Sequence, residues 1–150
     1  MTPLEIVRTY YSLFDSPSRE KLDSVVTDDF ALDDNPIDWH LRGKEDLWRT
    51  VDRPHSAPPA DQPPAFVVVD YVGDAERGAA KWHWRVTGGG AVMLGLPRTD
   101  KVAEVDGVAM VTFSDGKLTS LTEYWDAASA MRQLGADIHQ PRFGAPVAAG

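Results

Sequence analysis

The sequence contains no cysteine, which excludes disulfide bonds, thiolate nucleophiles and cysteine-ligated metal sites. It has no secretory leader pattern and no run of about 18 apolar residues that would predict a membrane span. Basic residues are also scarce, since 15 Lys and Arg stand against 23 Asp and Glu, with a formal charge of -8. Acidic proteins are poor partners for nucleic acid and for anionic membrane surfaces. We therefore expect a cytoplasmic protein that binds neither.

The length of 150 residues is enough to bury a core together with a pocket, and we expect a single domain over residues 1–150. Residues 137–150 are rich in Pro, Gly and Ala, a composition that predicts a flexible or lid-like tail. No two of the four histidines have the spacing of metal ligands, so we expect no metal site.

Hydrophobic periodicity predicts the order of the helices and strands. Apolar residues at three- and four-residue spacing predict helices near 3–14, 22–26 and 43–51. Strands are predicted at 30–36, 65–72, 79–87, 102–113 and 117–126, with a proline-rich loop at 53–64. Asp115-Gly116 predicts a two-residue hairpin turn between the last two strands. The order predicts an α+β fold whose curved sheet buries one face against the helices.

Two carboxyl groups are predicted to face the interior. The period of two along the last strand places Glu123 on the same face as Leu121 and Trp125. Asp34 shares a face with Leu32 on the first strand, although it is also a natural turn former ahead of a proline. Two acids in one apolar cavity are driven toward different protonation states, one acid and one base. This is acid/base chemistry that requires neither a metal nor a redox cofactor.

Basic residues on the strand at 79–87 are candidates to act on these acids. We expect His83 to serve as a general base or to orient a carboxylate, and Arg85, on the same face, to pair with Glu123. A register shift within this strand would instead turn Trp82 and Trp84 inward and His83 toward solvent.

Several motifs resemble the SnoaL-like polyketide cyclase branch of the nuclear-transport-factor-2-like superfamily. They are WRVTG at 84–88, GLPRTDKVAEVDGVAMVTFSDGKLTSLTEYWD at 95–126 and QLG at 133–135. The resemblance implies a cone-shaped, curved antiparallel or mixed β-sheet wrapped around N-terminal helices, and a homodimer. Its relatives include ketosteroid isomerases and limonene epoxide hydrolases, although the superfamily also contains non-catalytic binding proteins.

The resemblance assigns roles to individual residues. Asp34 matches the proton-shuttling Asp of the isomerases, and Tyr10 matches the tyrosine of their oxyanion hole. Glu123 matches the terminal-strand Asp of the epoxide hydrolases, and His83 falls where those enzymes carry Arg. Trp125 matches a pocket aromatic of the isomerases.

One element of the isomerase site is missing, because the second acid of its oxyanion hole aligns near Ala109 or Met110. The catalytic residues that we predict are Asp34, Glu123, His83 and Tyr10. The predicted substrate-binding residues are Leu32, Trp39, Trp84, Arg85, Met93, Met110, Leu121 and Trp125.

These observations predict an enzyme that acts on an apolar small molecule without a cofactor. The leading hypothesis is a cyclase or isomerase of polyketide or other secondary-metabolite biosynthesis, with the apolar segment 92–97 and the tail gating its cavity. An epoxide hydrolase or epoxide-opening cyclase and a dehydratase are alternatives that use the same acids. A non-catalytic small-ligand-binding protein is the alternative from another class.

Overall fold

The computed structural model of the chain describes residues 1–52 and 64–144. The helical segments are α1 (Pro3–Ser12), α2 (Arg19–Val25), the 3-10 turn η1 (Asn35–Ile37), α3 (Lys44–Val51), α4 (Gly88–Met93) and α5 (Ala127–Gln133). The strands are β1 (Val26–Asp34), β2 (Trp39–Arg42), β3 (Phe66–Gly73), β4 (Arg77–Val86), β5 (Ala103–Ser114) and β6 (Lys117–Trp125). The predicted proline-rich loop lies outside the described residues, apart from Pro64.

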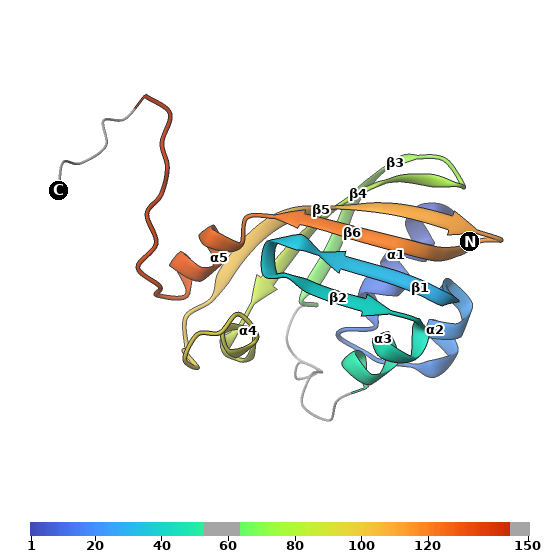
Figure 1. Cartoon of the computed structure of the whole chain (residues 1–150), viewed down its shortest axis with the longest axis horizontal. Helices are drawn as coiled ribbons and strands as arrows, with labels where there is room; N and C mark the ends of the chain where they lie inside the picture. The colour runs from blue at the N-terminus through green and yellow to red at the C-terminus, as the bar shows by residue number, and fades with distance from the viewer. Residues whose placement is uncertain (53–63, 145–150) are drawn as a thin grey trace.

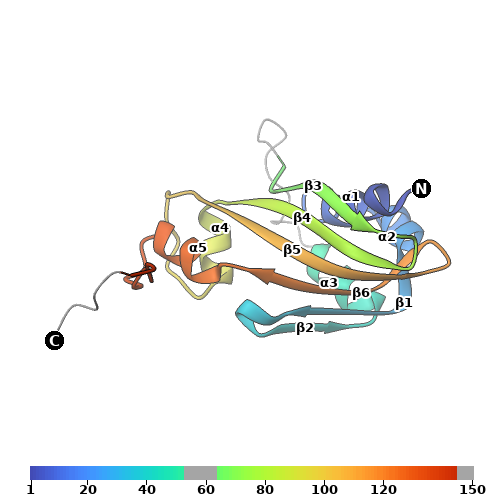
Figure 2. The same cartoon turned by 90° about the horizontal axis from the view of Figure 1, so that it is seen from above.

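The strands form one mixed sheet in the order β2-β1-β6-β5-β4-β3. All neighbouring pairs are antiparallel except β1 and β6, which run parallel. Helices α1, α2 and α3 lie against one face of the sheet, whereas α4 and α5 lie at the end where β4 and β6 finish (Figures 1 and 2). This arrangement confirms the predicted α+β fold with a curved sheet around the N-terminal helices.

Local sequence signals explain where the elements begin and turn. Thr2 caps α1 through a reciprocal capping box with Glu5, and the α1 residues that face the sheet are buried. Asp115 and Gly116 both have positive φ, 49° and 74°, as the predicted hairpin turn requires. The Asp126 carboxylate accepts a hydrogen bond from the Ser129 amide at 2.9 Å and caps α5.

Three features of the fold differ from the sequence-based prediction. Strand β1 begins at Val26 rather than Phe30, because an irregular register lets it pair with β6 from Leu118 onward. Strand β2 has only four residues, and no strand is predicted there from the sequence. Helix α4 begins with three glycines, which are poor helix formers, so its sequence did not indicate a helix.

Residues 137–144 carry no helix or strand and lead away from the sheet (Figures 1 and 2). Among the described residues, no helix is both long and apolar enough to cross a membrane.

The centre of the core depends on a close contact between β4 and β5. Gly107 on β5 is the register partner of Trp82 on β4, whose side chain is fully buried. A Cβ atom added at Gly107 would lie 2.2 Å from Trp82 Cζ2 and 2.4 Å from Cη2. The indole therefore lies directly over the glycine, and any side chain at that position would displace it.

We expect Gly107→Ala to destabilise the fold by about 2 kcal/mol, within the range for overpacking a rigid core. Urea denaturation measures the change in the free energy of unfolding. Trp82→Phe removes the ring atoms that the new methyl group would meet, so Gly107→Ala should cost less in a Trp82→Phe background. Equal costs in the two backgrounds would contradict the assigned contact.

Candidate active site

Asp34 and Glu123 lie side by side within the core. Asp34 is the last residue of β1, and Glu123 is its register partner on the parallel strand β6. Their relative exposures are 4% and 6%, although a carboxyl group is rarely buried without a partner. Both face the same side of the sheet as Leu32 and Leu121, which are also register partners. The two acids that the sequence singled out are therefore neighbours inside one apolar layer.

The two carboxyl groups are close enough for each to shift the pKa of the other, and a hydrogen bond between them requires a proton on one of the two. Burial, with the nearby charge of Asp34, raises the pKa of Glu123 to about 8. Burial also raises the pKa of Asp34, but hydrogen bonds from Glu123 and Trp125 oppose this shift. At neutral pH the arrangement therefore favours a protonated Glu123 beside an ionised Asp34.

Each acid also accepts a hydrogen bond from an aromatic side chain. The Tyr11 hydroxyl on α1 donates to Glu123 Oε1 at 2.6 Å. The indole nitrogen of Trp125 donates to Asp34 Oδ1 at 2.8 Å. These donors fix the orientation of both carboxyl groups, and the partly exposed Trp125 separates Asp34 from solvent. The sequence-based prediction missed Tyr11, because the resemblance points to its neighbour, Tyr10.

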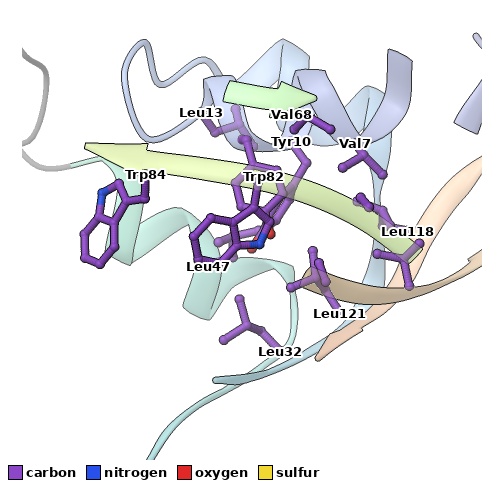
Figure 3. Packing of buried hydrophobic residues seen from close by; sticks show 14 of the residues in the cluster. Val7, Tyr10, Leu13, Leu32, Leu47, Val68, Trp82, Trp84, Leu118 and Leu121 are labelled. Atoms are coloured by element: carbon purple, nitrogen blue, oxygen red, sulfur yellow. The ribbon is translucent and has the colours of Figure 1, made fainter. Parts of the chain in front are cut away.

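Two further polar atoms near this pair have no hydrogen-bond partner among the described residues, the Tyr10 hydroxyl and Trp82 Nε1. Both side chains are buried, and Figure 3 shows them in the same part of the core. Burial and the charges of Glu123 and Asp34 raise the pKa of Tyr10 well above its usual value. The Tyr10 hydroxyl therefore remains protonated and available as a donor.

Aromatic rings extend from the acids across the inner face. Trp84 packs edge-on against Trp125 at 5.4 Å between ring centroids and stacks on Phe66 at 5.3 Å. Trp39 on β2, the register partner of Asp34, is half-buried at the other side of the pair. These rings provide a largely apolar surrounding in which electrostatic interactions are strong.

The predicted orientation of His83 and Arg85 is wrong. Regular alternation along β4 buries Trp82 and Trp84, so the intervening His83 lies on the opposite face of the sheet. There His83 contacts Asp106 at 2.9 Å and Glu104 at 3.3 Å, and these carboxylates raise its pKa. No register shift occurs between β4 and β5, so simple alternation explains the outcome.

Two predicted substrate-binding methionines also lie away from the acids. Met110 alternates with the buried Ala109 and Val111 on β5 and is 50% exposed on the outer face. Met93 on α4 is 56% exposed. Their predicted place in the pocket wall is therefore wrong, because the strand and helix turn both side chains outward.

Two surface cavities lie elsewhere. One of about 290 Å³ is lined by Val26, Thr27, Asp28, Lys44, Ser114, Asp115 and Lys117. The other, of about 360 Å³, is lined by Leu96, Pro97, Arg98, Thr99, Lys101, Leu134, Gly135 and Ala136. Neither is lined by Asp34 or Glu123, so the acids lie beneath packed side chains.

The mixed sheet around N-terminal helices is an α+β fold, which this chain shares with solved proteins of ketosteroid isomerase-like and nuclear-transport-factor-2-like fold. Residues 7–121 match the family described as SnoaL-like domain, and the chain belongs to this family. A search of curated proteins found no match to the sequence.

Solved structures share the fold at low sequence identity. IdmH from Streptomyces antibioticus, which is proposed to be a polyketide cyclase, is 19% identical with a TM-score of 0.66, covering 91% of this chain and 100% of that one. A Catenulispora acidiphila protein with a ketosteroid isomerase-like fold, in complex with trimethylamine, is 15% identical with a TM-score of 0.67. The match covers 90% of this chain and 95% of that one. AclR from Streptomyces galilaeus, proposed to be a hydroxylase, is 16% identical with a TM-score of 0.64. The match covers 92% of this chain and 87% of that one.

The raised pKa of Glu123 makes the stability of the fold depend on pH. Between the unfolded value of about 4.3 and the folded value of about 8, the folded chain holds a proton that the unfolded chain has lost. This contribution to stability is complete below pH of about 4.3 and falls by about 1.4 kcal/mol per pH unit until the folded pKa is passed.

We expect the free energy of unfolding of Glu123→Gln to lack this decline relative to the wild type. Urea denaturation at intervals between pH 5 and about 8.5 measures both curves. Contributions from groups unaffected by the substitution are common to both proteins and cancel in the comparison. Parallel curves would show that Glu123 does not retain its proton.

Proposed function

We propose that the protein is a cofactor-free acid/base enzyme that acts on an apolar small molecule. The observation that carries this proposal is the buried, register-paired Asp34 and Glu123, whose burial raises the pKa of both carboxyl groups. Acid and base catalysis requires groups with complementary protonation states near the operating pH. A stable core has no comparable need for two adjacent buried acids, because burying them is unfavourable.

The pair can transfer a proton without a net change in its own charge. The Asp34 carboxylate removes a proton from the carbon next to a substrate carbonyl group, and the protonated Glu123 delivers one to the resulting enolate. Transfer of the first proton from Asp34 to Glu123 then restores the starting state. Tyr11 and Trp125 hold the carboxyl groups in place during these steps.

Tyr10 supplies a donor for the negative charge that develops on the substrate oxygen. Its hydroxyl is buried, protonated and without a partner among the described residues. A donor of this kind stabilises an enolate more strongly than a neutral carbonyl group. The surrounding aromatic and aliphatic side chains favour an apolar substrate.

The most specific form of the proposal is a cyclase or isomerase of polyketide or other secondary-metabolite biosynthesis. Membership of the SnoaL-like family and the fold shared with IdmH support this form. Ring closure and isomerisation both begin with removal of a proton next to a carbonyl group, which the acid pair can perform. Epoxide opening and dehydration are alternatives that would use the same two acids.

A non-catalytic ligand-binding protein is the second candidate function. It is favoured by the packing over the acids, because neither of the two surface cavities is lined by Asp34 or Glu123. A substrate must therefore enter by displacing side chains, and Trp125 is a partly exposed side chain that contacts Asp34 directly.

A simple ketone distinguishes the two candidates without knowledge of the natural substrate. We expect the protein to accelerate exchange of the acidic carbon-bound protons of 2-tetralone with deuterium oxide, followed by NMR. Glu123→Gln and Asp34→Asn should each reduce the rate by about 100-fold or more. The wild-type rate should also fall above pH of about 8, where Glu123 loses its proton.

Glu104→Gln and Asp106→Asn are matched controls, because these acids lie on the outer face with His83. Their exchange rates should equal that of the wild type. Exchange that is unaffected in both Glu123→Gln and Asp34→Asn would rule out the two-acid scheme, whereas binding without any exchange would favour the ligand-binding protein.

We also propose that the protein forms a homodimer through the outer face of the sheet. Val108 and Tyr124, register partners on β5 and β6, are exposed there, and Met110 follows on β5. His83 and Asp106 provide polar groups beside them. An apolar centre with polar groups at its edge is typical of a protein interface.

We expect Met110→Glu to shift the protein toward a monomer, because the new charges of both subunits would be buried in the interface. Light scattering coupled to size-exclusion chromatography measures the mass at several concentrations. Val102→Glu, an exposed apolar residue outside the strands, is the control. A wild-type protein that is monomeric throughout would contradict the proposal.

A further inference from the structure

Trp82 is a fully buried aromatic residue, and its indole nitrogen has no role in the proposed acid/base reaction. Its Nε1 has no hydrogen-bond partner among the described residues. An indole N–H can only donate, so no group within the side chain itself compensates for the loss of water. Leaving such a donor unpaired in the core costs about 1–3 kcal/mol.

The position of the Trp82 ring brings it close to the acid pair. Because Gly107 has no side chain, the indole lies across β5, and strand β6 with Glu123 and Trp125 is the next strand of the sheet. Its centroid lies 6.2 Å from that of Tyr11 and 6.4 Å from that of Trp125. These are the two residues that donate to the acids.

A second unpaired donor belongs to the same group of rings. Tyr10 packs edge-on against Tyr11 at 5.0 Å, and its pKa responds to the charges of both acids. Tyr11 is thus in contact with both Tyr10 and Trp82, which Figure 3 labels within the buried cluster. At Ala109, the β5 residue opposite Glu123, no polar side chain is present. Trp82 therefore supplies a donor on the side of the site where β5 supplies none.

We propose that Trp82 Nε1 and the Tyr10 hydroxyl together bind one acceptor oxygen of the ligand beside Asp34 and Glu123. Two donors that converge on one atom select a carbonyl oxygen, which has two lone pairs and no proton. The ligand class is thus an uncharged ketone or related carbonyl compound rather than an amine. This inference rests on the proposed function for the identity of the reacting pair.

The indole N–H signal of Trp82 in a proton–nitrogen NMR spectrum tests this contact directly. The sequence has five tryptophans, and Trp82→Phe assigns the signal by its loss. The probes are 2-tetralone and tetralin, which have the same ring skeleton but differ in the oxygen. We expect 2-tetralone to move the Trp82 N–H signal downfield, and tetralin to leave its proton shift close to the free value.

Affinities provide the second measurement. The ratio of 2-tetralone affinity to tetralin affinity should fall about tenfold in Trp82→Phe, as expected for loss of a buried hydrogen bond. Trp48→Phe is the matched control, because Trp48 packs on Arg19 at the surface of α3. Benzothienylalanine at position 82 replaces the N–H with sulfur but keeps the ring size, so it separates loss of the donor from loss of packing.

Several outcomes would overturn the inference. One is binding of 2-tetralone with an unmoved Trp82 N–H signal and an unchanged affinity ratio in both Trp82 variants. Another is absence of 2-tetralone binding up to its solubility limit. If the wild type catalyses deuterium exchange but neither the Trp82 N–H signal nor the affinity ratio responds, the acid pair remains the proposed catalyst. Only the role of Trp82 is then rejected. Conversely, a shifted Trp82 N–H signal without deuterium exchange would support the carbonyl-binding site and contradict the proposed catalytic function.

Discussion

The burial of Asp34 beside Glu123 is the constraint on which the inner face of this protein depends. Two adjacent carboxyl groups in the core must share a proton, because two buried charges of the same sign would repel strongly. The register of β1 against β6 creates this proximity, and Tyr11 and Trp125 then donate one hydrogen bond to each acid. The helix that supplies Tyr11 and the strand that supplies Trp125 are therefore tied to the acids as well as to the hydrophobic core.

The sequence predicted that both acids face one apolar cavity, but not the strand register that makes them direct neighbours. Alternation along the last strand correctly turned Glu123 inward, and the hairpin turn and the cap at Asp126 followed from local residue chemistry. The parallel contact between β1 and β6 joins segments about 90 residues apart in the sequence. Nothing local in either segment specifies this partner, because it is set by the closure of the whole sheet.

The error at His83 shows how strongly apolar burial decides orientation. A strand that reads Trp-His-Trp can bury either the two indoles or the imidazole. Each indole buries about 150–250 Å², and at about 25 cal/mol per Å² this is several kcal/mol per ring. The structure accordingly buries Trp82 and Trp84. Placing a histidine beside the two acids would have exposed both indoles, which is less favourable.

Tyr10 and Tyr11 illustrate a finer limit. Successive residues on a helix are about 100° apart, yet both of these side chains are buried because α1 is enclosed by other elements. Which hydroxyl reaches Glu123 depends on the distance between α1 and β6. Hydrophobic periodicity in the sequence does not predict that distance. The structure pairs Tyr11 and leaves the donors of Tyr10 and Trp82 unpaired. In the folded chain alone these donors are unfavourable, so a ligand oxygen that satisfies both would bind more tightly than its apolar contacts alone provide. The same polar atoms that weaken the core would, in the proposed complex, make it selective for a carbonyl compound.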